Sequence, residues 1–132
     1  MPSNKQLLNS LASDYPQLIF RHGKKFAFHP PDTIVLGPPH DNFALLTLHE
    51  LAHATLKHKD FNLDVERLKI ETSAWQQTKK LCHKYHIAWD EEFAEDNLDT
   101  YRDWLHKKSL CPTCNLSRYQ DPSGTYHCPF CR

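Results

Sequence analysis

Four cysteines near the C-terminus restrict the fold of this chain more than any other feature of its sequence. Cys111 and Cys114 form one C-x-x-C pair, and Cys128 and Cys131 form a second after a span that can turn back at Asp121-Pro122-Ser123-Gly124. This spacing is typical of a zinc ribbon, in which four thiolates close a tetrahedral site. A segment this short cannot bury a core, so the metal would supply its folding energy. Two disulfides or a redox pair are the alternatives.

The composition predicts one domain followed by a small appendage. The chain has 132 residues, and from Ser109 onward it is rich in cysteine, proline and turn residues. We therefore expect one domain over residues 1–108 and a zinc ribbon over residues 109–132. Cys82, the fifth cysteine, lies on a helical apolar stripe and is expected to be a core thiol.

The charge balance gives no reason to expect a nucleic-acid or membrane protein. The 16 basic and 16 acidic side chains cancel, and no apolar run reaches the roughly 18 residues of a membrane helix. No secretion signal is evident in Met1–Ser13, so we expect a cytoplasmic protein. The ribbon is the one place where nucleic acid could bind, through Tyr119, Tyr126 and Phe130, but its net charge with zinc bound is only about +1.

Hydrophobic periodicity predicts an α+β fold. Three short aromatic and β-branched runs indicate a small antiparallel sheet whose first two strands form a hairpin. Apolar residues at helical spacing indicate a short N-terminal helix, an antiparallel helix pair and a third helix. The expected strands are 17–20, 24–28 and 33–36, the expected helices are 4–12, 42–58, 63–85 and 91–107, and the ribbon forms a β-hairpin.

The second helix carries the sequence His49-Glu50-Leu51-Ala52-His53, an H-E-x-x-H motif. Residues four apart on a helix share one face, so His49 and His53 present their imidazoles one turn apart and can grip a zinc ion. Glu50 is suited to take a proton from a zinc-activated water. The chemistry predicted is hydrolysis; a chance spacing or a purely structural metal is the alternative.

A catalytic zinc usually has a third protein ligand. If the helices meet at a turn near residue 61, residues of about 69–73 lie opposite the histidines, and Glu71 is the only acid among them. His58 would reach the metal only if the chain turned sharply after His53, and no glycine is present there to permit it. We therefore predict Glu71 as the third ligand and His58 as a cation at the helix C-terminus.

The H-E-L-A-H motif followed by a glutamate on the next helix resembles the minimal gluzincin metallopeptidases, especially the ImmA/IrrE-like group. The segment Glu71-Thr72-Ser73-Ala74 also resembles that group's E-x-x-A segment. The resemblance covers about residues 4–88 and implies His49, His53 and Glu71 as ligands and Glu50 as base. Larger gluzincins place an aspartate that orients a histidine where Trp75 stands here, so this support must come from another residue.

The resulting hypothesis is a zinc metallopeptidase that cleaves an intracellular protein or peptide and holds two zinc ions, one catalytic and one structural. A non-catalytic module that binds protein or nucleic acid is the alternative, as is a SprT-like protease, which also joins H-E-x-x-H to a ribbon. Substrate, activation and oligomeric state do not follow from the sequence. Several side chains are chemically able to stabilise the oxyanion: His40, His83, Tyr85, His86 and Tyr101.

Overall fold

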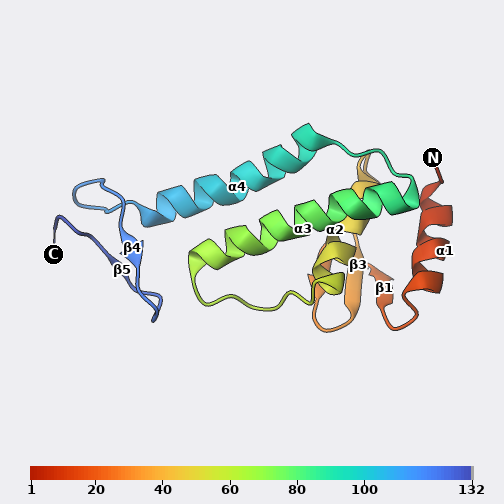
Figure 1. Cartoon of the computed structure of the whole chain (residues 1–132), viewed down its shortest axis with the longest axis horizontal. Helices are drawn as coiled ribbons and strands as arrows, with labels where there is room; N and C mark the ends of the chain where they lie inside the picture. Colours follow the sequence, from red (N-terminus) through yellow and green to blue (C-terminus); the bar gives the residue numbers. More distant parts are fainter. Residues whose placement is uncertain (132) are drawn as a thin grey trace. The chain divides into compact units, whose positions relative to one another are not determined.

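The structure is a computed structural model that describes residues 1–131; Arg132, included in the predicted ribbon, lies outside them. The described residues form four helices and five short strands, which confirm the predicted α+β class (Figure 1). In chain order they are α1 (Asn4–Asp14), β1 (Ile19–His22), β2 (Ala27–His29), β3 (Thr33–Leu36), α2 (Phe43–Thr55), α3 (Asp64–Tyr85), α4 (Glu91–Ser109), β4 (Tyr119–Gln120) and β5 (Tyr126–His127).

The chain divides into two compact units. The first contains residues 1–59 and 73–90, and the second contains residues 60–72 and 91–131. Helix α3 runs without a break through the division: its residues 64–72 belong to the second unit and its residues 73–85 to the first. The division at Lys108 predicted from composition stays a prediction.

The three-stranded sheet of the first unit has the order β1-β3-β2. Strand β1 is parallel to β3, and β2 is antiparallel to it, so the sheet is mixed and the predicted hairpin of the first two strands is wrong. The physical reason is burial. Ile34, Val35 and Leu36 of β3 are almost completely buried, whereas β1 and β2 are more exposed. The most apolar strand takes the centre, where both of its edges are hydrogen-bonded.

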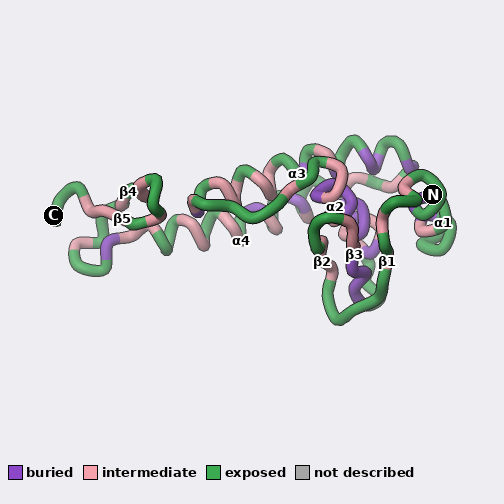
Figure 2. Tube along the Cα trace, turned by 90° about the horizontal axis from the view of Figure 1, so that it is seen from below, coloured by how far each residue is buried: buried purple, intermediate pink, exposed green. Residues whose placement is uncertain are grey.

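The core of the first unit lies where α2 meets β3. These two elements are the most continuously buried segments in Figure 2. Helix α2 is buried around most of its circumference, as its sequence predicts. Helix α1 begins with a capping box between Ser3 and Gln6, and it contributes the buried side chains of Leu7 and Leu11. Cys82 is also buried in the core, as expected, and burial raises the pKa of its thiol to about 11.

The second unit is organised around the beginning of α3. The buried carboxylate of Asp64 accepts hydrogen bonds from the Tyr126 hydroxyl at 2.7 Å and from Lys108 Nζ at 3.3 Å. Its backbone N–H donates to Gln120 Oε1 at 2.8 Å. One turn later, the guanidinium of Arg67 lies over three aromatic rings, 5.0 to 5.7 Å from their centroids. These rings belong to Phe61, Tyr101 and Trp104.

No helix within residues 1–131 combines the length and the apolar character needed to cross a membrane.

Thr47 on α2 offers a test of the core. Its hydroxyl is fully buried and, among residues 1–131, is the one buried side-chain polar group without a hydrogen-bond partner. Replacing Thr47 by the isosteric valine removes this unsatisfied group, so Thr47→Val should raise the free energy of unfolding by about 1 kcal/mol. Urea denaturation measures the change. A loss of stability would mean that the hydroxyl is hydrogen-bonded in solution.

Candidate metal centres

Helix α2 brings together the two histidines of the H-E-x-x-H motif. His49 and His53 are both buried, with relative exposures of 6% and 8%. Their Nε2 atoms are 3.2 Å apart, and their ring planes cross at 80°. Both rings therefore present the same nitrogen to one point, as the helical spacing predicts.

Helix α3 supplies a third donor, Glu71. Ligand atoms of His49, His53 and Glu71 all lie within 4.8 Å of one another. Glu71 stands one turn before Trp75 on the unbroken helix, and Trp75 stacks on His49 with ring centroids 4.0 Å apart and planes inclined by 24°. The glutamate that the sequence singled out is thus one of three clustered donor residues.

The three donors fit a zinc ion. Two nitrogens, each about 2.0–2.1 Å from a tetrahedral zinc, lie about 3.3 Å apart, close to the observed Nε2 separation of 3.2 Å. Two imidazoles and one carboxylate are also a common donor set for zinc in hydrolases. Among residues 1–131 this group contains three donors, whereas zinc takes four, so one position would be left for a water or a substrate.

The Nδ1 atoms of both histidines have partners that the sequence did not reveal. His49 Nδ1 is 3.4 Å from the hydroxyl of Thr78, and His53 Nδ1 is 2.9 Å from Nδ1 of His58. The chain turns after α2 without a glycine, contrary to the prediction, because Lys57 adopts a left-handed conformation with φ of 55°. His58 therefore turns back against His53, a contact that its predicted role at the helix C-terminus did not include. It is not one of the three clustered donors.

Glu71 also has a second contact. The hydroxyl of Tyr101 hydrogen-bonds to the Glu71 carboxylate, and burial together with this negative charge raises the pKa of Tyr101. The hydroxyl of Tyr85 donates a hydrogen bond to Asp14 at 2.6 Å. Burial and this hydrogen bond raise the pKa of Tyr85. Both tyrosines considered for oxyanion stabilisation are thus hydrogen-bonded to carboxylates. Glu50 is half-buried and follows His49 on α2.

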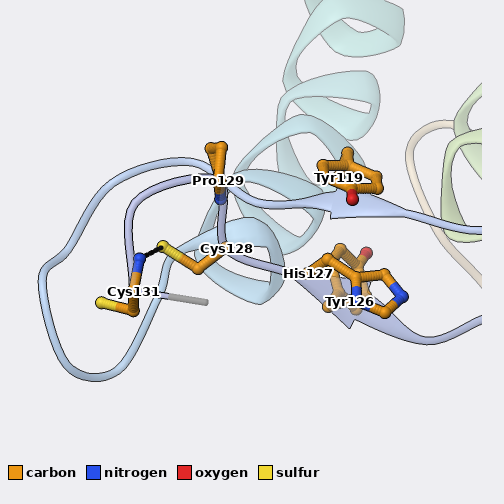
Figure 3. A pocket seen from close by; sticks show the side chains of 6 residues that line it. All are labelled: Tyr119, Tyr126, His127, Cys128, Pro129 and Cys131. Atoms are coloured by element: carbon orange, nitrogen blue, oxygen red, sulfur yellow. Dashed lines mark hydrogen bonds between the residues drawn. The ribbon is translucent and has the colours of Figure 1, made fainter.

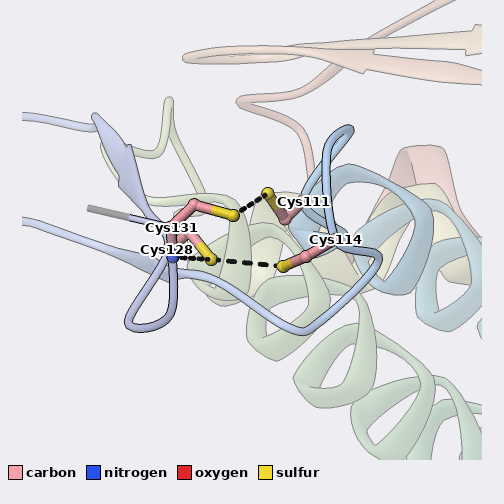
Figure 4. Close-up of side chains that lie close together, drawn as sticks. All are labelled: Cys111, Cys114, Cys128 and Cys131. Atoms are coloured by element: carbon pink, nitrogen blue, oxygen red, sulfur yellow. Dashed lines mark hydrogen bonds between the residues drawn. The ribbon is translucent and has the colours of Figure 1, made fainter.

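The four ribbon cysteines also form a cluster, drawn in Figure 4. The Sγ atoms of Cys111 and Cys131 are 3.8 Å apart, and those of Cys114 and Cys128 are 3.5 Å apart. Four sulfurs about 2.3 Å from a tetrahedral zinc lie about 3.8 Å from one another, so the arrangement fits this ion. The separations exceed a disulfide bond, and all four are free thiols in the structure.

The backbone prepares two of these thiols for metal binding. Backbone N–H groups of Cys114 and Thr113 lower the pKa of Cys111 to about 6, and the N–H of Cys131 lowers the pKa of Cys128. Hydrogen bonding with Cys114 and burial raise the pKa of Cys131 to about 12. Asn115, with φ of 64°, turns the first knuckle so that its N–H reaches the carbonyl of Cys111 at 2.9 Å.

The ribbon hairpin is held by its own polar contacts. Strands β4 and β5 are antiparallel, and Asp121 accepts hydrogen bonds from Ser123, Thr125 and His127 across the turn. The hydrogen bond from the Ser123 hydroxyl is the main reason that the pKa of Asp121 is lowered. A cavity of about 650 Å³ lies beside the hairpin, and the Tyr119 ring stacks on His127 in its wall. Figure 3 shows the side chains that line it. Its lining consists of Tyr119, Tyr126, His127, Cys128, Pro129 and Cys131.

Comparison of the chain with models of protein families, with curated protein sequences and with solved structures yields no match. The resemblance to ImmA/IrrE-like peptidases therefore stays a prediction from the motif.

Glu71→Gln tests the third ligand. The amide is a weaker zinc donor than the carboxylate, so zinc affinity at the histidine site should fall by about 10–100-fold or more, while the ribbon keeps its zinc. Glu66→Gln is the matched control, because Glu66 lies earlier on α3 and accepts a hydrogen bond from the Leu63 N–H. Competition with a chromogenic chelator measures both sites. Equal affinity in Glu71→Gln and the unmodified protein would exclude Glu71.

Deletion of Ser109–Arg132 tests the independence of the ribbon. The four cysteines share no donor with the histidine site, so the truncated chain should keep its helices and its histidine-bound metal. Asp64 would lose Tyr126 and Gln120 but keep Lys108, which predicts a loss of about 1–3 kcal/mol in the free energy of unfolding. Circular dichroism, urea denaturation and metal analysis check these outcomes. Complete unfolding would show that the ribbon is integral to the helical domain.

Proposed function

We propose that this protein is a zinc-dependent metallopeptidase that hydrolyses peptide bonds of a protein substrate. The observation that carries the proposal is the convergence of three donors, His49, His53 and Glu71, on one point beside a glutamate in the H-E-x-x-H position. A zinc ion held by three protein donors has room for one more ligand, as catalytic zinc sites do.

The donor sets distinguish the two proposed zinc sites chemically. Two neutral imidazoles and one carboxylate would leave a zinc ion with a net charge of about +1, so the site stays electrophilic. Four thiolates would leave about −2 and fill every coordination position. We therefore assign the chemistry to the histidine site and a structural role to the ribbon cysteines.

Zinc bound at the histidine site would supply Lewis-acid activation of a water molecule and of the scissile carbonyl. The chain itself contributes the remaining groups. Glu50 follows His49 on α2 and would accept the proton of the attacking water, then deliver it to the leaving amine. The buried surroundings of His49 and His53 strengthen electrostatic interactions at the site, because few water molecules compete for them.

The Glu50→Gln variant tests this function. The amide is nearly isosteric with the carboxylate but cannot take a proton, so both zinc ions should remain while peptide hydrolysis falls by about 10²–10⁴-fold. Glu92→Gln, which neutralises an exposed carboxylate on α4, should leave hydrolysis unchanged.

The measurement is the appearance of new protein N-termini in a cell extract incubated with each protein, together with metal content by mass spectrometry. Cleavages made by the unmodified protein and by Glu92→Gln, but not by Glu50→Gln, would identify the substrates. Two bound zinc ions with identical N-termini in all three samples would instead favour a non-catalytic binding module.

A further inference from the structure

We propose that Thr78 and His58 are positioning residues for the histidine metal site, which hold His49 and His53 through Nδ1 and thereby aim both Nε2 atoms at the metal. The inference rests on the metal site of the proposed function but not on the reaction. In larger gluzincins an aspartate orients a zinc-binding histidine, and Trp75 stands at its position in this chain. The inference assigns this orienting role to two residues outside the H-E-x-x-H motif.

The direction of the hydrogen bonds at Thr78 follows from their lengths. The Thr78 hydroxyl is 2.6 Å from the carbonyl oxygen of Ala74 and 3.4 Å from His49 Nδ1. A hydroxyl has one hydrogen, and the shorter contact to an obligate acceptor holds it. The Thr78 oxygen can therefore only accept from His49, which requires the hydrogen of the neutral imidazole to be on Nδ1.

The consequence for His49 is a fixed tautomer. With its hydrogen on Nδ1, the neutral ring has a lone pair on Nε2, the atom that faces His53 Nε2 at 3.2 Å. Thr78 is fully buried and His49 nearly so, so bulk water does not readily replace this contact. Stacking on Trp75 holds the plane of the same ring.

His58 supports His53 in the corresponding way. The two Nδ1 atoms are 2.9 Å apart, and the left-handed residue Lys57 turns the chain so that His58 reaches back to α2. When His53 binds metal through Nε2, its Nδ1 carries the hydrogen and donates it to His58 Nδ1. Outer partners of this kind orient metal-binding histidines, and their loss commonly weakens metal binding by about 10–100-fold.

Thr72 provides a matched control for Thr78. It lies on the same helix and makes the same back-bond, from its hydroxyl to the carbonyl of Leu68 at 2.8 Å. Thr78→Val should lower zinc affinity at the histidine site by about 10–100-fold, whereas Thr72→Val should change it by less than about twofold. Thr78→Ser, which keeps the hydroxyl, should restore most of the affinity. His58→Ala should weaken zinc binding by about tenfold, and His83→Ala, at an exposed position on α3, should not.

The affinities are measured on the full-length chain by chelator competition, with the ribbon zinc as an internal reference. Cobalt substitution separates the two sites, because the thiolate site has sulfur-to-cobalt charge-transfer absorption that a histidine and carboxylate site lacks. The second readout is ¹⁵N NMR of the imidazoles in the metal-free protein. His49 should carry its hydrogen on Nδ1 in the unmodified protein and in Thr72→Val, and should shift toward the Nε2–H form in Thr78→Val.

The outcomes separate this inference from the proposed function. If the unmodified protein binds no metal at the histidines, the proposed function fails. If it binds zinc, but Thr78→Val and His58→Ala bind with the same affinity, the positioning inference is overturned while the metal site stands. If Thr78→Val does not fold, the NMR spectrum of the unmodified protein decides for His49, because an Nε2–H tautomer would contradict the role of Thr78.

Discussion

The burial of two imidazoles in an apolar helix is the constraint on which the first unit depends. Polar rings taken out of water destabilise the fold unless their nitrogens find partners. Within the unit, Trp75 and Thr78 of α3 contact His49, and His58 contacts His53. The packing of α3 against α2 therefore has a second effect besides covering apolar surface: it leaves the two Nε2 atoms facing each other.

The two candidate metal centres differ in how far the folding of the surrounding segment depends on a bound metal. Among ribbon residues 109–131 only Cys111 is buried, and the four thiols converge through backbone turns that include a left-handed residue, Asn115. A metal bound there holds the segment together but has no position left for substrate. The candidate histidine site lies on helices that already have buried apolar side chains, so a metal bound there would not be needed to hold them together.

Much of the fold and of the candidate metal centres could be predicted from the sequence, because these features depend on local patterns. The helical periodicity of residues 43–55 places His49 and His53 on one face, and the two C-x-x-C pairs bring four thiols together with the aid of a single turn. Glu71 was predictable from the short connection between two helices, since antiparallel packing leaves few positions opposite the histidines. The strand pairing was not: β1 and β2 do not form a hairpin, because the more apolar β3 lies between them.

By itself the sequence determined the fold class, the four helices and the two candidate groups of metal donors, with Glu71 as the third member of the first group. Each of these depends on residue type and on spacing along one element or across one short turn. Only the tertiary structure decided which residues hold the imidazoles. Thr78 looks like any buried threonine on a helix, and its partner His49 is far away along the chain. His58 is close to His53 in sequence, but its contact depends on Lys57 adopting a conformation that lysine seldom takes, and local propensity does not favour it.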